Sequence, residues 1–504
     1  MPTLTPLFPS RRAQPETGRF DEPASFPEYR GYAPPACALS ILIPLFNEEE
    51  FIGTLLERVL SATLPDGLGR EIIVVDDGST DGSDRIVEEI AARERGRIQL
   101  IRHGRNRGKG AAIRTAVERA TGEYCLIQDA DLEYDPQEYQ RLLKPLLEGK
   151  ADAVYGSRFM IVAERRVMYY WHSIANHFVT NLCNLVADLN LTDMGTGYKA
   201  FRTALLAETP IASDRFGFEP EITIKLARRG ARIYEVPVSY YGRTYEEGKK
   251  IRFRDAAAIV ASIFRFAFSG DLYKDPGAKT LHALSAAPRF NRWMADTIRP
   301  FVGQRVLEIG SGIGNLTRAL VQGRDRYVAT DINPEHLSRL ASRFPHRPNL
   351  EVHHCDLTCA ADFEPFANSM DTVICLNVLE HVEDDALGLA NIYSILDHGG
   401  RALVLVPEGQ SVFGTIDVAL GHFRRYSEDE LKRKMEAAGF HVERIVRFNR
   451  VSRLPWYVSG RILKRTSLDW NQMKLYDRFV WLWRRIDPYL PWRPASIIGV
   501  ARKP

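Results

Sequence analysis

The sequence predicts two α/β domains in tandem, each built around a mostly parallel sheet. Short apolar segments alternate with segments of helical length from Leu39 to about Phe268, and a second series of the same kind starts near Arg305. Short strands that alternate with helices are typical of parallel sheets covered on both faces. The 504 residues also exceed what a single compact core normally holds. The two series share no evident repeat, so we expect a fusion of two different modules.

Each expected strand is a short run rich in Val, Ile and Leu. In the first series the strands are expected at 39–43, 71–75, 98–101 and 123–128, with helices from Glu48, from Asp81 and near Arg107. In the second series they are expected at 305–309, 327–330, 350–354, 372–376 and 402–406. Residues 1–38 are rich in proline and are expected to be a disordered leader. Residues 274–288 are expected to be a linker, which leaves domains at 39–273 and 289–504.

Composition excludes several classes of protein. The formal net charge is +3, from 67 basic and 64 acidic residues, so a nucleic-acid binder that relies on bulk charge is not expected. The six cysteines are too few and too scattered for a disulfide framework and fit a reducing cytoplasm. No signal peptide is evident, and no apolar run approaches the ~18 residues that a membrane span requires.

Three acids, Asp129, Asp131 and Glu133, come directly after the strand expected at 123–128. The carboxyl edge of a parallel sheet is where open α/β folds bind ligands. Alternate acids there can direct oxygens at one hard cation such as Mg²⁺ or Mn²⁺, which also binds phosphates. An isolated Asp-x-Asp is more often a pair of solvated loop acids, so the neighbouring motifs decide the interpretation.

Three further motifs accompany these acids. Pro44-Leu-Phe-Asn-Glu-Glu49 follows the first strand, Asp76-Asp-Gly-Ser79 follows the second, and Asn106-Arg-Gly-Lys-Gly110 opens a helix. The last motif is not a P-loop, because Gly104 is one residue too close and Gly110 replaces the required Ser or Thr. What remains is a group of backbone N–H donors, with Lys109, near phosphate.

Together with the segments 156–159, 192–202, 218–219 and 243–250, these motifs resemble inverting family 2 glycosyltransferases of the GT-A fold. The resemblance covers about residues 39–270 and is strongest to polyprenyl- or dolichyl-phosphate sugar synthases. It implies a nucleotide pocket lined by Pro44, Asn47, Glu48, Asp77 and Lys109, and metal and diphosphate binding by Asp129, Asp131 and Glu133. It also implies that the donor diphosphate and lipid phosphate are held by Arg158, Arg202, Arg243 and Lys249.

The implied chemistry needs no strong base, because an acceptor phosphate is already anionic and can attack the sugar directly. Catalysis then rests on positioning and on neutralising the departing nucleoside diphosphate. Asp193 or Glu219 would orient the acceptor, and the sequence does not choose between them. Relatives often carry an acid and a Cys where Gly195 and Gly197 stand.

In the second series, a strand runs into Gly310-Ser-Gly312-Ile-Gly314 and then a helix. Asn315 occupies the last glycine position of the dinucleotide fingerprint, which disfavours NAD. Asp331 and Asp356 end the next two strands, and Asn377-Val-Leu-Glu-His381 the fourth. This order resembles class I S-adenosylmethionine-dependent methyltransferases, which have a Rossmann-like fold. The resemblance implies that S-adenosylmethionine is bound by Glu308, Gly310, Gly312, Gly314, Asp331 and Asp356.

Two interpretations remain open for the residues that would bind the methyl acceptor. Gly421-His-Phe-Arg-Arg-Tyr426 would either hold the acceptor, with His422 as a base, or be a folded basic loop. His381 would be catalytic or, more often in this pattern, structural.

A Trp- and Arg-rich insert at 451–494 would either be a cap that packs its aromatics inward or a surface for membrane headgroups. The segment Arg252–Phe268, with Ile259, Ile263 and Phe266 at near-helical spacing, would be a second docking site.

The sequence therefore predicts a bifunctional enzyme. It would transfer a sugar from a UDP- or GDP-linked donor to polyprenyl phosphate, and methylate a glycan or lipid-linked product. It would act in the cytoplasm, in peripheral contact with the inner face of the cell membrane and without nucleic acid. The alternatives are transfer to a growing glycan, or one domain that has become a regulatory binding module.

Overall fold

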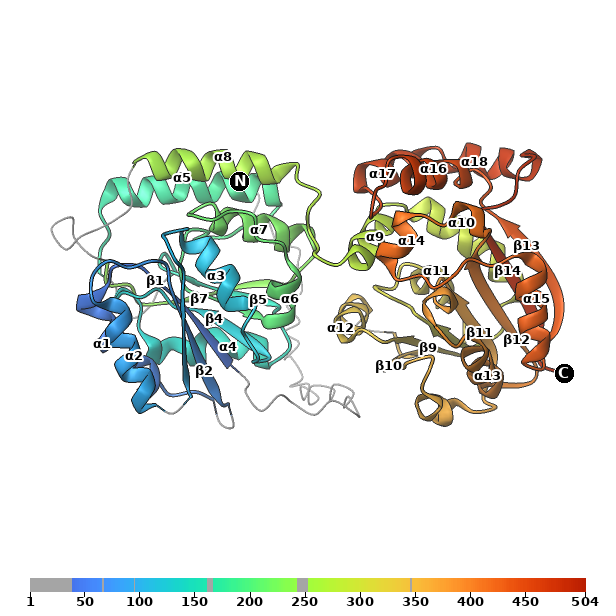
Figure 1. The fold of residues 1–504 in the computed structure, drawn as a ribbon, viewed down its shortest axis with the longest axis horizontal. Coiled ribbons are helices and arrows are strands. Elements are labelled where there is room, and N and C mark those ends of the chain that lie inside the picture. The colour runs from blue at the N-terminus through green and yellow to red at the C-terminus, as the bar shows by residue number, and fades with distance from the viewer. Residues whose placement is uncertain (1–38, 66–67, 95, 161–165, 243–252, 345–346) are drawn as a thin grey trace, which may run out of the picture. The chain divides into compact units, whose positions relative to one another are not determined.

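The computed structural model describes residues 39–504 except 66–67, 95, 161–165, 243–252 and 345–346. Its strands form two separate seven-stranded sheets, each with its own helices (Figure 1). The prediction of two tandem α/β domains is confirmed. The expected disordered leader lies outside the described residues, as do Arg243 and Lys249.

The first sheet has the order β3-β2-β1-β4-β6-β5-β7. Its parallel half contains β1 (Leu39–Leu45), β2 (Arg70–Asp76), β3 (Ile98–Arg102) and β4 (Tyr124–Ile127). Strand β6 (Lys199–Arg202) is antiparallel to both β4 and β5 (Ala153–Ser157), and β7 (Ile233–Pro237) is parallel to β5. The ends of β1, β2 and β4, and the start of β6, therefore meet at one edge of the sheet.

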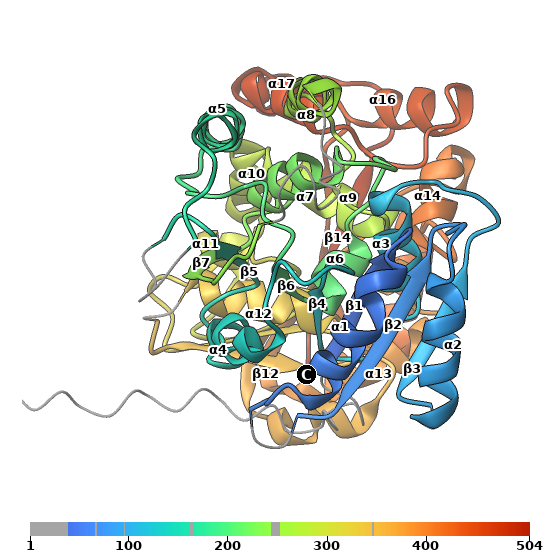
Figure 2. The same ribbon diagram turned by 90° about the vertical axis from the view of Figure 1, so that its left-hand side faces the viewer.

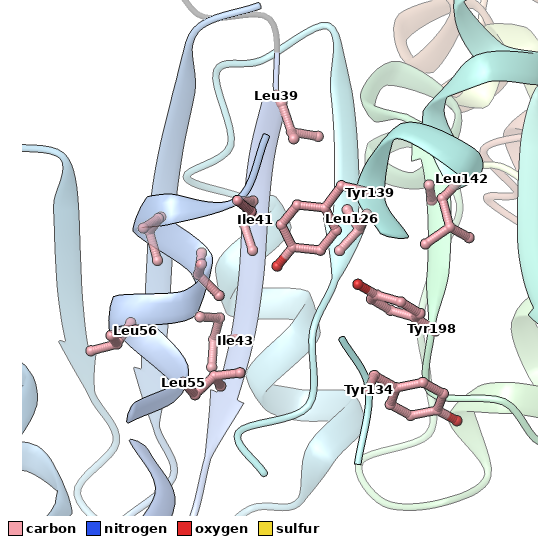
Figure 3. Packing of buried hydrophobic residues seen from close by; sticks show 14 of the residues in the cluster. Leu39, Ile41, Ile43, Leu55, Leu56, Leu126, Tyr134, Tyr139, Leu142 and Tyr198 are labelled. Atoms are coloured by element: carbon pink, nitrogen blue, oxygen red, sulfur yellow. The ribbon is translucent and has the colours of Figure 1, made fainter. Parts of the chain in front are cut away.

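Alternating residues of β1 face two different cores, as the period of a strand requires. Leu39, Ile41 and Ile43 pack with α1 (Glu49–Ser61) and α4 (Tyr139–Leu147), where Tyr139 and Tyr198 lie near each other (Figure 3). Leu42 faces the other core. That second face of the sheet is covered by α3 (Lys109–Val117), α5 (Tyr170–Ala187), α7 (Phe218–Arg228) and α8 (Phe253–Ala267). The remaining helices of this domain are α2 (Ser83–Arg93), η1 (Pro136–Glu138) and α6 (Thr203–Glu208).

The second sheet has the order β10-β9-β8-β11-β12-β14-β13. The parallel strands are β8 (Arg305–Ile309), β9 (Arg326–Asp331), β10 (Leu350–His354), β11 (Met370–Leu376) and β12 (Leu396–Pro407). They follow the doubly wound order in which the strand order reverses between the first and fourth strands. Strand β14 (Ser496–Arg502) is antiparallel to both β12 and β13 (His441–Phe448). The glycine motif follows β8, at the reversal point where such folds bind ligands.

The helices of the second domain connect these strands. They are α10 (Pro288–Ile298), η2 (Arg299–Phe301), α11 (Thr317–Leu320), α12 (Pro334–Arg343), η3 (Ala360–Phe366), η4 (Leu379–His381), α13 (Asp385–Ile395), η5 (Gln410–Val412), α14 (Thr415–Leu420) and α15 (Glu428–Ala437). The insert forms α16 (Arg453–Tyr457), η6 (Val458–Ile462), α17 (Trp470–Arg478), α18 (Val480–Ile486) and η7 (Asp487–Tyr489). Within the described residues, no helix combines the length and apolar character that crossing a membrane requires.

The segment 274–288 differs from the expected linker, because it contains helix α9 (Pro276–Ser285). Asp275 caps the helix by accepting a hydrogen bond from the Ala278 N–H at 2.5 Å, and Pro276 stands at its first position. Asp and Pro are common at the start of a helix as well as in turns, so the same residues fit either structure. The side chain of Leu281 lies against Gly312, so α9 packs onto the glycine loop of the second domain.

Candidate active sites

A half-buried lysine lies among the acids at the edge of the first sheet. Lys109 begins α3, and its Nζ lies 2.7 Å from Asp129 Oδ1 and 3.4 Å from Glu219 Oε1, which comes from α7. Burial alone would lower the pKa of Lys109, but the charges of Asp129 and Glu219 raise it above its usual value. The structure therefore brings a fixed positive charge and two carboxylates together where β4 ends.

The loop that carries Lys109 is held by Asp77. The Asp77 carboxylate accepts hydrogen bonds from the N–H groups of Arg107 (3.0 Å) and Gly108 (2.6 Å) and lies 2.7 Å from His103 Nδ1. Gly108 has φ +107°, and a Cβ there would overlap the Asp214 carbonyl, so only glycine fits. Asp77, expected to line the nucleotide pocket, thus uses its carboxylate to shape the loop.

The residues expected around the nucleotide also lie at this edge. Pro44 is in the last part of β1, and Asn47 follows it with φ 50°. Asn47 Oδ1 accepts a hydrogen bond from the Thr80 N–H at 2.8 Å, and the Glu48 N–H donates to Ser83 Oγ at 3.0 Å. These bonds join the loops after β1 and β2 into one wall.

The acid motif after β4 does not converge on one point. Asp131 is largely buried, and its Oδ1 accepts a hydrogen bond from the Glu133 N–H at 3.1 Å. Glu133 turns its carboxylate toward Tyr240, whose O–H donates at 2.9 Å. Within the described residues these three acids do not form a cluster of three ligand atoms. The expectation that these three acids bind one metal ion stays a prediction; in this structure Asp129 is paired with Lys109 and Glu133 with Tyr240.

Asp193 and Arg158 form a buried pair. Arg158 Nε and Nη2 donate to Asp193 at 2.6 and 2.8 Å, and Asn176 donates to the same carboxylate at 3.0 Å. Burial would raise the pKa of the fully buried Asp193, but Arg158 lowers it below its usual value. Asp193, expected to orient the acceptor, therefore fixes Arg158, whose guanidinium also lies over the Tyr240 ring.

Arg202 was expected to bind phosphate, but the structure places it at the end of β6 that is remote from the acids. Strand β6 is antiparallel to β4, so Lys199 pairs with Ile127 beside the acids, whereas Arg202 pairs with Tyr124. Along the strand, Lys199 and Arg202 are three residues and therefore about 10 Å apart. Arg202 instead lies 3.5 Å from a carboxylate oxygen of Glu123.

Lys199 is the residue that the sequence reasoning missed. It is buried, and its Nζ donates to the carbonyls of Met194 and Thr196. Burial lowers its pKa to about 8. The available signal was its position at the end of the motif segment 192–198, where a short strand begins.

The glycines at 195 and 197 have a steric explanation. A Cβ on Gly197 would overlap Asp129 Oδ2, and a Cβ on Gly195 would lie 2.6 Å from Asn176 Oδ1. The missing side chains leave room for Asp129 and for the amide that supports Asp193.

In the second domain, the glycine loop and Asp331 form one unit. Gly310, Gly312 and Gly314 have φ of +71°, +54° and +79°, which favour glycine. The Gly312 N–H donates to Asp331 Oδ2 at 2.7 Å, and His336 Nδ1 lies 3.2 Å from Oδ1. Burial would raise the pKa of Asp331, but His336 and these hydrogen bonds lower it, so the carboxylate is ionised.

Glu308 and Asp356 differ in their surroundings. Glu308 is buried beneath the loop, where its carboxylate accepts hydrogen bonds from Thr317 (2.6 Å) and Tyr327 (2.9 Å). The expected contact of Glu308 with the cofactor stays a prediction; in this structure both bonds hold its carboxylate inside the fold. Asp356 follows β10, and its Oδ1 accepts hydrogen bonds from the backbone and side chain of Thr358.

The loop 421–426 turns most of its polar side chains inward. Arg425 Nε donates to Asp417 at 2.8 Å, and the Tyr426 O–H donates to Asp385 at 2.8 Å. His422 Nδ1 lies 3.0 Å from Asp417 Oδ1. This geometry favours the folded basic loop over an open acceptor surface for Arg425 and Tyr426.

The insert at 451–494 packs some of its tryptophans inward and exposes others. Trp456 Nε1 donates to Asp417 at 3.3 Å and Trp483 Nε1 to the Tyr476 carbonyl at 3.2 Å, so these rings pack inward. Trp481 and Trp492 are exposed.

An exposed apolar face lies on α5 and α8, which run alongside each other and cover α7 (Figures 1 and 2). Its members are Tyr170, Trp171, Ile174, Phe178, Leu185, Phe264 and Phe268. Trp171 is 76% exposed and Phe268 is 85% exposed. The docking residues expected from sequence are corrected in part, because Ile263 and Phe266 are buried in the core.

The fold and these two sites define a chain of two α/β transferase domains. A family model described as glycosyl transferase family 2 matches residues 40–209, and one described as a methyltransferase domain matches residues 307–402. The chain belongs to glycosyl transferase family 2 and carries a methyltransferase domain. The predicted GT-A type and Rossmann-like domains are thereby confirmed.

Among the relatives, the glycosyltransferase AglJ of Haloferax volcanii is 31% identical over 232 residues, which are 45% of this chain and 71% of that protein. The undecaprenyl-phosphate 4-deoxy-4-formamido-L-arabinose transferase of Edwardsiella ictaluri is 29% identical, over 42% of this chain and 62% of that protein. The dodecaprenyl-phosphate galacturonate synthase of Rhizobium johnstonii is 26% identical, over 42% of this chain and 61% of that protein. The match thus spans less than two thirds of the latter two relatives.

Proposed function

We propose that the first domain transfers a sugar, with inversion, from a UDP- or GDP-linked donor to polyprenyl phosphate. The observation that carries this proposal is the cluster of Lys109, Asp129 and Glu219 at the edge of a family 2 domain. The names of two relatives, which specify undecaprenyl and dodecaprenyl phosphate, support the acceptor class.

A divalent cation would be held by Asp129 and Asp131. Their oxygens suit Mg²⁺ or Mn²⁺, which typically takes one or two protein carboxylates together with substrate phosphates. A bound cation would supply charge neutralisation for the departing diphosphate. Lys109 supplies a further fixed positive charge, because its pKa is raised. Arg158, held by Asp193, would bind a phosphate of the donor or acceptor through its planar fork. Pro44, Asn47 and Glu48 would line the nucleotide pocket.

The second domain would use S-adenosylmethionine to methylate a glycan or a lipid-linked product. The glycine loop fits this cofactor, since its three glycines adopt the positive φ that a tight turn requires and carry no side chains of their own. The ionised Asp331 suits two ribose hydroxyls. Asp356 would lie near the other end of the same pocket.

We also propose peripheral membrane contact through the apolar face of α5 and α8. A polyprenyl phosphate presents its reactive oxygen at the headgroup level, so the enzyme must approach that plane. Exposed aromatic rings such as Trp171 and Phe178 favour this interface.

The test is mass spectrometry of the product formed by the full-length protein from membrane lipid extract and UDP- or GDP-sugars. The expected product is a polyprenyl monophosphate that carries one sugar, and a methyl group is added when S-adenosylmethionine is supplied. Transfer to a soluble glycan in the absence of lipid would contradict the proposed acceptor.

A further inference from the structure

Three side chains of the second domain point donor atoms at one another. Glu380, His381 and His422 each offer one ligand atom, and these atoms all lie within 4.8 Å of one another. The rings of His381 and His422 meet edge to face with centroids 4.7 Å apart, and His422 Nε2 lies 4.0 Å from Glu380 Oε1. Two imidazoles with one carboxylate are a donor set typical of Zn²⁺ and non-haem Fe²⁺.

Glu380 has no partner for its carboxylate among the described residues. Its side chain is 1% exposed, and neither carboxylate oxygen has a hydrogen bond to any described group. Unsatisfied buried polar groups are rare, and a buried charge without a partner costs several kcal/mol. Arg425, the cation that acts on Glu380, directs its guanidinium at Asp417 instead. The carboxylate is therefore buried without a hydrogen-bond partner among the described residues, and His422 Nε2 lies 4.0 Å from it.

His422 is held as metal-binding histidines usually are. Its Nδ1 lies 3.0 Å from the buried Asp417 Oδ1, and its Nε2 lies on the side of Glu380. A carboxylate behind a histidine fixes the tautomer and raises the basicity of the ligating nitrogen.

We propose that Glu380, His381 and His422 bind a divalent transition-metal ion, with Asp417 as the positioning residue behind His422. The ligand atoms around Zn²⁺ lie about 3.3 Å apart. The observed spacings, which are at most 4.8 Å, therefore need to contract by no more than about 1.5 Å.

The position of this site connects it with the glycine loop. Its first two ligands, on η4, follow β11 at the carboxyl edge of the sheet. A Cβ on Gly310 would overlap the side chain of Val378, two residues before Glu380, so η4 adjoins the glycine loop. Three protein ligands leave at least one coordination position open. In a further step that rests on the proposed methyl transfer, this position would take an oxygen of the methyl acceptor.

The experiment measures metal binding by the full-length protein after chelation and dialysis. The protein carries Asp131→Ala, which removes a main acidic donor of the first domain. The probes are Co²⁺ and Zn²⁺. About one Co²⁺ should bind per chain with the d–d absorption of a nitrogen-ligated site. Zn²⁺ should raise Tm, because an ion that binds only the folded state stabilises it.

Glu380→Gln and His422→Gln should each weaken Co²⁺ binding at least about tenfold. The matched control is His441→Gln, which changes an exposed histidine at the start of β13 and should bind as the parent does. His381→Asn, at an exposed ring, serves if either buried variant fails to fold.

Absence of Co²⁺ binding in the parent would overturn the proposal, as would variants that bind like the control. Normal binding of Co²⁺ combined with metal-independent methyl transfer would keep the site and reject only its link to the acceptor.

Discussion

The carboxylate of Asp77 accepts a 2.6 Å hydrogen bond from the Gly108 N–H, so the loop after β2 holds the loop that presents Lys109. Gly108 immediately precedes Lys109, the first residue of α3. The position of the Lys109 side chain therefore depends on Asp77, which is 32 residues earlier in the chain and has no described contact with the Lys109 side chain. This arrangement makes the site sensitive to changes in backbone packing as well as to loss of its charged groups.

Gly197→Ala should disable sugar transfer by displacing Asp129. The added Cβ would overlap Asp129 Oδ2, and displacement of a catalytic group by about 1 Å can cost roughly 10²-fold in rate. Initial rates of transfer to polyprenyl phosphate measure the effect. Gly104→Ala is the matched control, because nothing lies within 4 Å of its Cβ position. Equal rates in the two variants would show that the position of Asp129 does not matter.

Asp131→Ala should abolish sugar transfer in a folded protein. The loss of one carboxylate for the cation removes charge compensation for the departing diphosphate, and single contacts of this kind are worth roughly 10²–10³ in rate. The measurement is turnover against Mg²⁺ and Mn²⁺ concentration, with Glu57→Ala on the exposed face of α1 as a control. Metal-dependent turnover at the control rate would remove Asp131 from the mechanism.

Asp331→Ala should weaken S-adenosylmethionine binding and leave sugar transfer near the parent rate. The ribose hydroxyls would lose a charged acceptor, at roughly 1.5–3 kcal/mol per hydrogen bond. Calorimetric titration checks the affinity, with the exposed Asp325→Ala as the control in the same domain. Loss of both activities in a folded variant would contradict the independence of the two sites.

Glu308 should make stability fall as pH rises. Burial raises its pKa to about 7, above the 4.5 expected in the unfolded chain, so between these values the folded state binds more protons. The contribution of protonated Glu308 to the free energy of unfolding is complete below pH 4.5 and is lost as pH rises through 7. The free energy of unfolding should fall by about 3 kcal/mol over this range. Glu308→Gln should flatten this dependence in the unfolding free energy of the second domain, and an unchanged slope would assign it to other groups.

Binding to anionic liposomes should depend on the apolar face of α5 and α8. Replacing both Trp171 and Phe178 with Ala removes two exposed rings, and burial of such side chains contributes about 1.5–3 kcal/mol each. Sedimentation with vesicles should show weaker binding, whereas Tyr234→Ala, on β7, should bind as the parent does. Added salt should weaken binding further if basic residues contribute. Unchanged sedimentation of the double variant would reject this face as the docking surface.

The sequence alone determined the two α/β domains, the edge of each sheet that carries the site, and most of the candidate residues. It could do so because strand periodicity, glycine loops and acids after strands are local patterns. The tertiary structure decided which side chains face one another. Lys199 lies at the site and Arg202 does not, because β6 runs antiparallel to β4. Glu308 is buried beneath the loop that it precedes. Glu380 and His422 meet although 42 residues separate them, since only the folding of the chain brings the end of β11 and the loop after α14 together. Such contacts depend on strand direction and packing between distant segments, which no local pattern encodes.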